Sequence, residues 1–233
     1  NMSFQEEKRE SIKRYMLEKI RQDDVCFIQK TMENFAISVT TVKRYIKECL
    51  EKDILCESEE TQTGFRLKTT MFSFTYNGKD RLDEDDIYCE DIRPLLEGTS
   101  KEAVSIWYYA FTEMMNNAIE HSGCSKISCM VRKDYLYTEI NIMDDGIGIY
   151  KNIQAHLQKT LGREVSCQEA LLELYKGKLT TCPERHSGEG VFFTSKVLNE
   201  FAIWSDDVIY SQGCYDKGNF VQSHLLAYHN RLK

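Results

Sequence analysis

The chain has 233 residues, of which 42% are hydrophobic and only two are proline, so we expect one large or two modest folded domains rather than a disordered tail. No apolar run is long enough to span a membrane, and no secretory apolar segment follows the amino terminus. The nine cysteines are scattered without a C-x-x-C pair, which argues against a disulfide framework or a zinc site and favours a reducing, cytoplasmic compartment.

The net charge of −7 is unevenly distributed along the chain. Residues 1–70 contain 13 basic and 13 acidic residues, so the acidic excess lies entirely after residue 70. A uniformly acidic protein would repel nucleic acid, but a neutral amino-terminal part can bind it where basic side chains gather.

The first 67 residues are predicted to form three helices and a hairpin. Apolar residues recur at helical spacing over residues 6–21, 27–35 and 39–52. Ser38 or Thr40 is the expected cap of the third helix, and β-like runs at 54–57 and 64–67 flank a polar tip. This order resembles the winged helix-turn-helix family, in which the third helix recognises DNA.

Candidate DNA-binding residues lie on the outward side of this third helix, where cations and hydroxyls can reach phosphates and base edges. They are Thr40, Thr41, Lys43, Arg44 and Lys47. The acidic wing tip at residues 57–60 would repel a DNA backbone, and winged helices also serve as protein-interaction or dimer modules. DNA binding is the leading hypothesis, and the protein-interaction role stays open.

Residues 68–98 are predicted to join the two parts, with a strand over 70–76 and a charged helix over 83–96 that Pro94 interrupts. A second helical pattern follows, with Glu113, Asn117 and His121 each four residues apart and therefore on one face. A carboxylate and an amide one turn apart can serve Mg²⁺, which prefers oxygen ligands.

Two glycine-containing segments come after this helix. An apolar run over 135–143 ends at Asp144, whose carboxylate can accept a hydrogen bond from an exocyclic amine. Gly146 and Gly148 follow and let the backbone approach a flat ligand. The later segment opens a helical stretch, where free N–H groups and the helix dipole favour phosphate. Its key residues are Ser187, Gly188 and Gly190.

Each segment alone is unspecific, since a solvated helix face, a turn or a capped loop would look the same. All three in this order resemble the GHKL ATPase superfamily, which includes gyrase-type topoisomerases, mismatch-repair ATPases, the heat-shock chaperone ATPase, sensor histidine kinases and anti-sigma serine kinases. The resemblance implies ATP and Mg²⁺ as cofactors, with Asn117 as the magnesium ligand and Glu113 as the general base. His121 matches a histidine of several members, or is simply a helix-end residue facing the dipole.

The same resemblance assigns Asp144 to the adenine amine and gives Gly146 and Gly148 the task of making room for the base. Ser187, Gly188 and Gly190 would form the second glycine box, which closes over the phosphates. Residues 150–186 would be the ATP lid, with a helix over 167–179. Within it, Lys178 either reaches phosphate or merely ends that helix favourably.

The carboxy-terminal part is predicted to contain a helix over 192–201 and strands over 202–204 and 208–211. GHKL domains usually close with a strand that opens Gly-Thr, and this chain shows none. The nearest candidate is 218–221, and 228–233 resembles a lead-in. Whether the chain continues further or lacks the strand stays open.

We therefore expect an α+β protein with a winged helix-turn-helix at 1–67, a linker at 68–98 and a GHKL α/β sandwich at 99–233, in which a mixed sheet carries helices on one face. No histidine precedes Glu113, which disfavours a histidine autokinase. The leading hypothesis is a cytoplasmic ATP-binding transcriptional regulator whose partners are ATP and DNA.

Two other functions remain open at this point. One is a serine/threonine kinase of the anti-sigma type that acts on a separate protein substrate. The other is a nucleotide-gated adaptor that neither binds DNA nor turns ATP over. A homodimer is compatible with all three, and a membrane partner is not expected.

Overall fold

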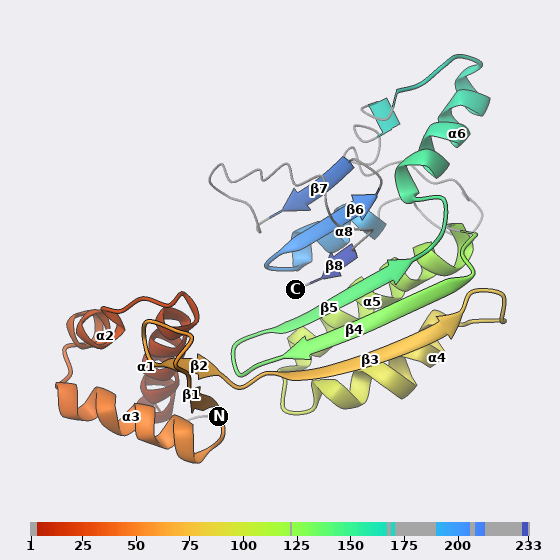
Figure 1. The fold of residues 1–233 in the computed structure, drawn as a ribbon. Coiled ribbons are helices and arrows are strands. Elements are labelled where there is room, and N and C mark those ends of the chain that lie inside the picture. Colours follow the sequence, from red (N-terminus) through yellow and green to blue (C-terminus); the bar gives the residue numbers. More distant parts are fainter. Residues whose placement is uncertain are drawn as a thin grey trace. The chain divides into compact units, whose positions relative to one another are not determined.

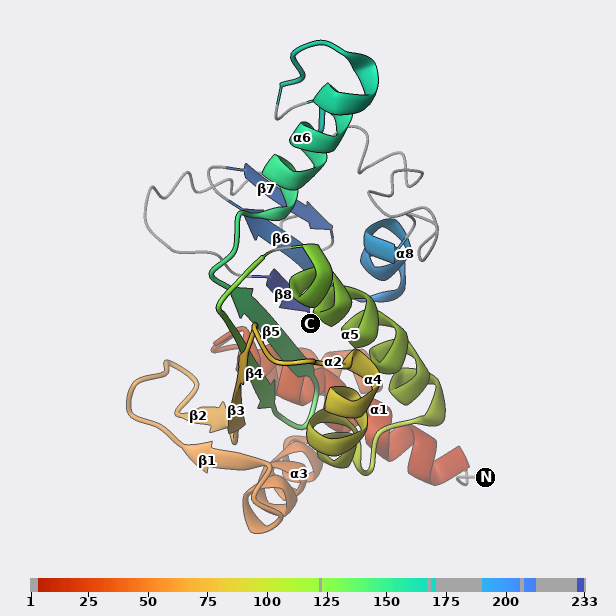
Figure 2. The same cartoon turned by 90° about the vertical axis from the view of Figure 1, so that its right-hand side faces the viewer.

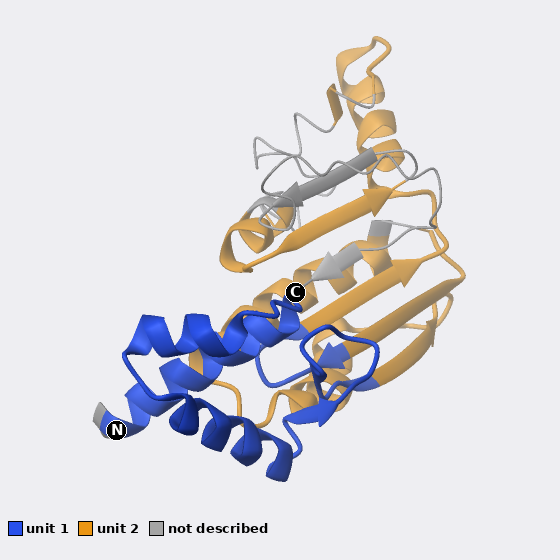
Figure 3. Cartoon of the chain, turned by 60° about the vertical axis from the view of Figure 1, so that its left-hand side comes forward, with its two compact units in different colours: residues 1–71, 132–138 blue, residues 72–131, 139–233 orange. Residues whose placement is uncertain are grey.

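The computed structural model (Figure 1) describes residues 4–121, 123–166, 169–170, 190–205, 208–212 and 230–232. The chain divides into two compact units, which Figure 3 colours separately. Unit 1 comprises residues 1–71 and 132–138, and unit 2 comprises residues 72–131 and 139–233. Among the helices that the structure describes, none has the length and apolar character that crossing a membrane requires.

Unit 1 contains three helices followed by a short hairpin, in the order expected from the sequence. The helices are α1 (Phe4–Arg21), α2 (Phe27–Phe35) and α3 (Val39–Glu51). Strands β1 (Leu55–Glu57) and β2 (Phe65–Leu67) pair antiparallel, with Leu55 opposite Leu67. All three helices contribute to one buried apolar cluster, which includes Met16, Phe27 and Val42.

The start of α3 is fixed by its cap. The Ser38 Oγ accepts a hydrogen bond from the Thr41 backbone N–H at 3.2 Å, which satisfies one of the free donors of the first turn. Of the two expected caps, Ser38 is therefore the residue used, and Thr40 is not.

The hairpin of unit 1 is tied to the turn between α1 and α2 through Asp23. The carboxylate of Asp23 accepts hydrogen bonds from the backbone N–H groups of Gln62 and Thr63 at 3.1 and 3.0 Å, and from the Thr63 hydroxyl at 3.2 Å. The hydrogen bonds from Thr63 and Gln62 favour the charged form and hold the pKa of Asp23 below its ordinary value. The tip of the hairpin is thus anchored rather than loose.

Unit 2 begins within β3 (Thr70–Asn77), which is followed by α4 (Glu84–Ile87). The helix continues without a break as a π-helical turn, Tyr88–Ile92, and a 3-10 turn, Arg93–Leu96. The expected helix over 83–96 is therefore present, with Pro94 in the final 3-10 turn. The remaining elements are α5 (Lys101–His121), β4 (Lys126–Lys133), β5 (Thr138–Asp144), α6 (Ile149–Leu161), α8 (Gly190–Val197), β6 (Phe201–Ser205), β7 (Val208–Gln212) and β8 (Asn230–Leu232).

Within the described parts of unit 2, six strands form one sheet in the order β3-β4-β5-β8-β6-β7. Strand β8 pairs antiparallel with both β5 and β6, with Asn230 opposite Ile142 and Ile203. Figure 1 shows β3, β4 and β5 alternating in direction. The expected mixed sheet is therefore wrong for these strands: β5 and β6 run the same way, but β8 lies between them, so each neighbouring pair is antiparallel.

Helices α4, α5 and α8 lie on one face of this sheet (Figure 2). Helix α5 buries its apolar stripe there, and the residues expected on that stripe are all buried. They are Trp107, Ala110, Phe111, Met114 and Ala118. Opposite them, Ile127 and Val131 of β4 and Ile140 and Ile142 of β5 complete the core, because alternate residues of a strand point to the same face.

Helix α6 is an element that the sequence reading missed, since it lies within the stretch assigned to a lid. Its buried residues Tyr150, Ile153 and Leu157 follow helical spacing, and Gly162 ends it in the left-handed conformation at φ 64. Of the helix expected over 167–179, the structure describes only residues 169–170. The strand candidate at 218–221 lies outside the described residues, whereas the lead-in at 228–233 contains β8.

Candidate functional site

Helix α5 presents the first group of candidate residues. Ser100 precedes the helix and accepts a hydrogen bond from the Ala103 backbone N–H at 3.2 Å, as a helix cap does. Glu113 and Asn117 are each half-buried, one turn apart and beside the face that packs on the sheet. His121 is the last residue of the helix, and its side chain lies outside the description.

The first residue of α8 lies directly against Glu113. A Cβ atom built on Gly190 would overlap the Glu113 Oε2 and would lie 2.8 Å from Cδ and 3.5 Å from Cγ. Only glycine permits this approach without displacing the carboxylate. Two segments that are 77 positions apart in the sequence are thereby in contact. The contact lies at the amino-terminal end of α8, where free N–H groups favour anions.

The second group lies at the end of β5. Asp144 is half-buried, and its Oδ1 accepts a hydrogen bond from the Gly146 backbone N–H at 2.9 Å. Gly148 has φ 84 and immediately precedes α6, so this position requires a residue without a Cβ. Ile147, between the two glycines, is 56% exposed. The turn therefore contains two residues without a side chain and presents the apolar side chain of Ile147 at its surface.

Asp145 fixes this turn to the start of β4. Its Oδ1 accepts hydrogen bonds from the Ser125 and Lys126 backbone N–H groups at 2.7 and 2.9 Å, and its Oδ2 accepts one from the Ser125 hydroxyl. The hydrogen bonds from Ser125 and Lys126 hold the pKa of Asp145 below its ordinary value. Sequence reasoning missed this residue, although two consecutive acidic residues at a strand end were the available signal.

The described parts bring Glu113 of α5 together with Gly190 of α8, and α5 also contacts α6, the helix that follows Gly148. Lys178, Ser187 and Gly188 lie outside the described residues. Of the three segments expected to act together, the first and third therefore meet at Glu113 and Gly190. The second segment, which ends at Gly148, is linked to the first through the contact between α6 and α5.

The oxygen atoms of Glu113 and Asn117 suit a metal ion that takes most of its ligands from water and substrate. Within the described residues there is no group of three or more His, Cys, Asp or Glu side chains that could hold a metal ion. Asn117 and Glu113 offer oxygen atoms from a single helix face. Because Mg²⁺ usually takes one or two protein ligands and completes its shell with water and substrate phosphates, these residues fit Mg²⁺ bound to a nucleotide.

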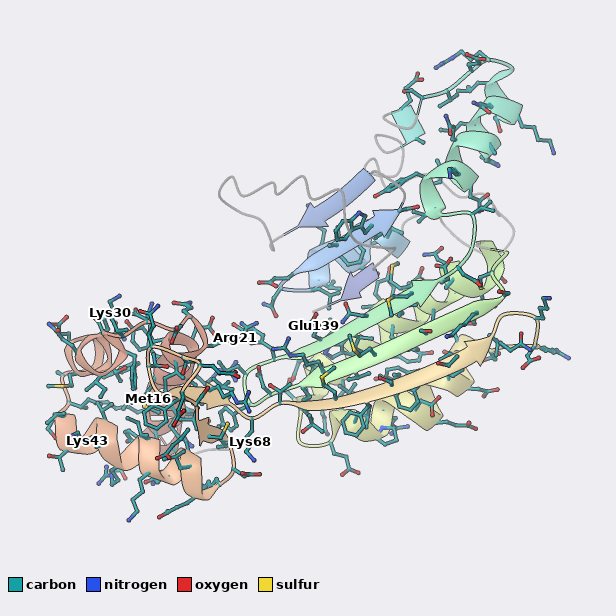
Figure 4. The ribbon with its side chains drawn as sticks, in the orientation of Figure 1. Met16, Arg21, Lys30, Lys43, Lys68 and Glu139 are labelled. Carbon is teal, nitrogen blue, oxygen red and sulfur yellow. The ribbon has the colours of Figure 1, made fainter. Side chains whose placement is uncertain are left out.

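The candidate DNA-binding residues remain largely accessible on α3. Thr40, Lys43, Arg44 and Lys47 are exposed, and Figure 4 shows Lys43 on the outer side of α3 and Met16 inside the helical cluster. Thr41 differs, because its backbone N–H and its hydroxyl both bond the Ser38 Oγ, at 3.2 and 3.1 Å. The hydroxyl of Thr41 therefore serves the cap.

Two of these α3 cations have neighbours on their own helix. The guanidinium of Arg44 lies 5.5 Å from the Tyr45 ring centroid, and the Lys47 ammonium lies 3.7 Å from Glu51. Both interactions are at the surface and weak, so neither would prevent a phosphate contact. At the acidic tip of the β1–β2 hairpin, Arg66 lies 3.9 Å from Glu60 and offsets part of the negative charge there.

No protein-family model matches the chain, and no curated protein matches it.

Proposed function

We propose that the chain is a cytoplasmic ATP-binding transcriptional regulator, in which a GHKL-type domain formed by unit 2 controls a DNA-binding winged helix formed by unit 1. The observation that carries the proposal is the contact between Gly190 at the start of α8 and the carboxylate of Glu113 on α5. It brings an anion-favouring helix start next to a carboxylate and an amide that suit Mg²⁺ chemistry.

This contact indicates where the phosphate groups of the nucleotide would bind. Backbone N–H groups at the start of α8 would hold phosphate oxygens, and Asn117 would bind the Mg²⁺ that neutralises them. Glu113 would then orient a water molecule or a substrate hydroxyl. A slow turnover is expected, since positioning and charge neutralisation contribute most to phosphoryl transfer.

The base end of the ligand would lie at the turn after β5. Asp144 would accept the adenine amine, and the backbone of the turn from Gly146 to Gly148 would approach the ring. The exposed side chain of Ile147 offers an apolar surface for the base. Asp145, bonded to Ser125 and Lys126, would keep this turn in place without contacting the nucleotide.

The DNA-binding role of unit 1 is supported by the exposed cations of α3, among them Lys43 and Arg44, and by the anchored wing. Control by nucleotide requires that Mg·ATP bind two states of the protein with different affinity. DNA and ATP must then change each other's affinity by the same factor.

The proposal is tested by measuring whether Mg·ATP changes the affinity for DNA. Binding of the full chain to labelled DNA is measured by fluorescence anisotropy at fixed salt, with and without saturating Mg·ATP. The proposal expects DNA binding whose affinity changes at least fivefold with Mg·ATP. DNA binding that is indifferent to nucleotide would contradict the regulatory claim, and no DNA binding at all would favour an adaptor. Transfer of labelled phosphate from ATP to a partner protein would instead identify a kinase of the anti-sigma type.

A further inference from the structure

The connection between β4 and β5 is a rigid, preformed tip that belongs to unit 1. The Asp134 Oδ1 accepts hydrogen bonds from the backbone N–H groups of Leu136 and Tyr137, each at 2.8 Å. The Asp134 backbone N–H donates to the Tyr137 carbonyl at 3.0 Å. These bonds close a tight turn, which presents the side chains of residues 135–137 in a defined arrangement.

One side of this tip is bonded to the first half of α1. The Tyr135 hydroxyl donates a hydrogen bond to the Glu10 Oε2 at 2.6 Å, and Glu10 also forms an ion pair with Lys13. The Lys13 ammonium lies 6.0 Å from the Tyr135 ring centroid, and Lys13 is only 8% exposed. A buried cation of this kind is stable only when its partners stay in place, so the tyrosine completes the group.

The other side of the tip contacts the end of the same helix. The guanidinium of Arg21 lies 4.3 Å from the Tyr137 ring centroid, within the range of a cation–π interaction. Leu136 packs against the apolar cluster of unit 1. Glu10 and Arg21 are 11 residues apart, which is about 16 Å along a helix, so the tip holds most of the length of α1.

The strands that carry this tip lead directly to the candidate nucleotide turn. The chain passes between the units after residues 71, 131 and 138, and two of these three crossings lie in β4 and β5. Strand β5 starts at Thr138, beside the tip, and ends at Asp144. A single strand therefore connects Asp144 to the tip along the chain.

Helix α1 in turn contacts the helix that carries the candidate DNA-binding residues. The guanidinium of Arg9 forms hydrogen bonds with the Glu48 carboxylate on α3 at 3.0 and 3.3 Å. Met16 of α1 and Val42 of α3, both fully buried, belong to the same apolar cluster. Any change in the position of α1 therefore affects the packing of α3.

We infer that the β4–β5 hairpin transmits nucleotide occupancy at Asp144 to α1, and through α1 to the DNA-binding helix. The inference rests on the proposed function of unit 2 and adds the means by which that site is coupled to unit 1. Tyr135, Leu136 and Tyr137 are the coupling residues, and Glu10 and Arg21 are their receptors on α1.

Hydrogen exchange of the full chain tests the first half of this inference without any ligand. Tyr135→Phe removes only the hydroxyl that bonds Glu10. Tyr108→Phe is the matched control, because its hydroxyl bonds the Asp85 carboxylate at 2.9 Å within unit 2. We expect amide exchange in α1 to be faster by about tenfold in Tyr135→Phe and unchanged in Tyr108→Phe. Equal exchange in both variants would overturn the inference.

The second half is tested by adding saturating Mg·ATP to the same three proteins. The inference expects exchange in α1 to change at least threefold on nucleotide binding in the wild type and in Tyr108→Phe, and to change less in Tyr135→Phe. Bound nucleotide with no response in α1, or with the same response in all three, would overturn it. Absence of nucleotide binding would contradict the proposed function instead, while the ligand-free comparison still decides whether the tip clamps α1.

Discussion

Two pairs of consecutive aspartates, Asp23-Asp24 in unit 1 and Asp144-Asp145 in unit 2, are used differently. In unit 1, Asp23 bonds the hairpin tip, and Asp24 forms a 2.6 Å ion pair with Lys30 and accepts a hydrogen bond from the Cys26 backbone N–H. Both carboxylates maintain the fold. In unit 2, Asp145 maintains the fold in the same way.

Asp144 has a different position from the other three aspartates. It lies in the glycine-containing turn, where its Oδ1 accepts a hydrogen bond from the Gly146 N–H, and the turn leads into a helix that contacts α5. The sequence Asp-Asp therefore has no fixed role: Asp23, Asp24 and Asp145 each bond a residue of another element, and Asp144 is distinguished by its place in the turn that contains Gly146 and Gly148. Among the four aspartates, Asp144 is the one that we assign to a ligand.

The largest effect is expected at Glu113 of unit 2. Glu113→Ala should lower ATP turnover by about 10²- to 10⁴-fold, the usual contribution of a general base, and should leave Mg·ATP affinity nearly unchanged. Phosphate release and calorimetry on the same preparation measure both quantities. Turnover that persists in the variant would refute Glu113 as the base.

A smaller effect on turnover is expected from Gly190→Ala, because the atoms that a Cβ would meet all belong to the Glu113 side chain. Since the end of that side chain is flexible, the methyl group should displace the carboxylate and cost little stability. We expect turnover about tenfold lower and a melting temperature within a few degrees of the wild type. In the double variant with Glu113→Ala, the second substitution should add nothing; additive losses would show that the two residues act separately.

In unit 1 the expected effect is smaller and depends on salt. Lys43→Ala should weaken DNA binding severalfold and reduce the slope of log affinity against log salt by about one, as for the loss of one phosphate contact. Lys30→Ala is the matched control, because Lys30 is paired with Asp24. Equal losses in the two variants would indicate a general effect of charge rather than a recognition helix.

The smallest effect concerns the structural aspartates. The pKa values of Asp23 and Asp145 are lowered by hydrogen bonds from the backbone and side chains of neighbouring residues, so their stabilisation is present above the unfolded-state pKa of about 3.9 and is lost as the pH falls through the folded-state value. Asp23→Asn and Asp145→Asn should therefore be destabilised near neutral pH, and the difference from wild type should shrink below about pH 4. Chemical unfolding over a pH series measures the free energy of unfolding of each protein. A difference between variant and wild type that grew as the pH fell would contradict this prediction.

The local elements of the fold could be predicted well from the sequence, because their patterns are short-range. The apolar spacing of α1, α2 and α3 predicted these helices within a few residues, and so did the alternation in β3 and the apolar stripe of α5. Helix α6 was missed because Tyr150, Ile153 and Leu157 were interpreted as part of a lid, although their spacing is helical.

Features that depend on distant residues could not be predicted. Nothing local in residues 134–137 indicates that they complete unit 1, since their partners Glu10 and Arg21 are more than 110 positions away. The insertion of β8 between β5 and β6 likewise depends on pairing across the whole of unit 2. The contact of Gly190 with Glu113 is intermediate, because the two segments were predicted to act together but their contact required the fold.

The most direct test of the central claim is a calorimetric titration of the full chain with Mg·ATP, beside its Asp144→Asn and Asp145→Asn variants. The account predicts binding to the wild type, affinity at least 100-fold weaker in Asp144→Asn, and a much smaller loss in Asp145→Asn, in which the amide oxygen can still accept the two backbone hydrogen bonds. Binding that is equally strong in wild type and Asp144→Asn, or equally weakened in both variants, would contradict the assignment of Asp144 to the nucleotide.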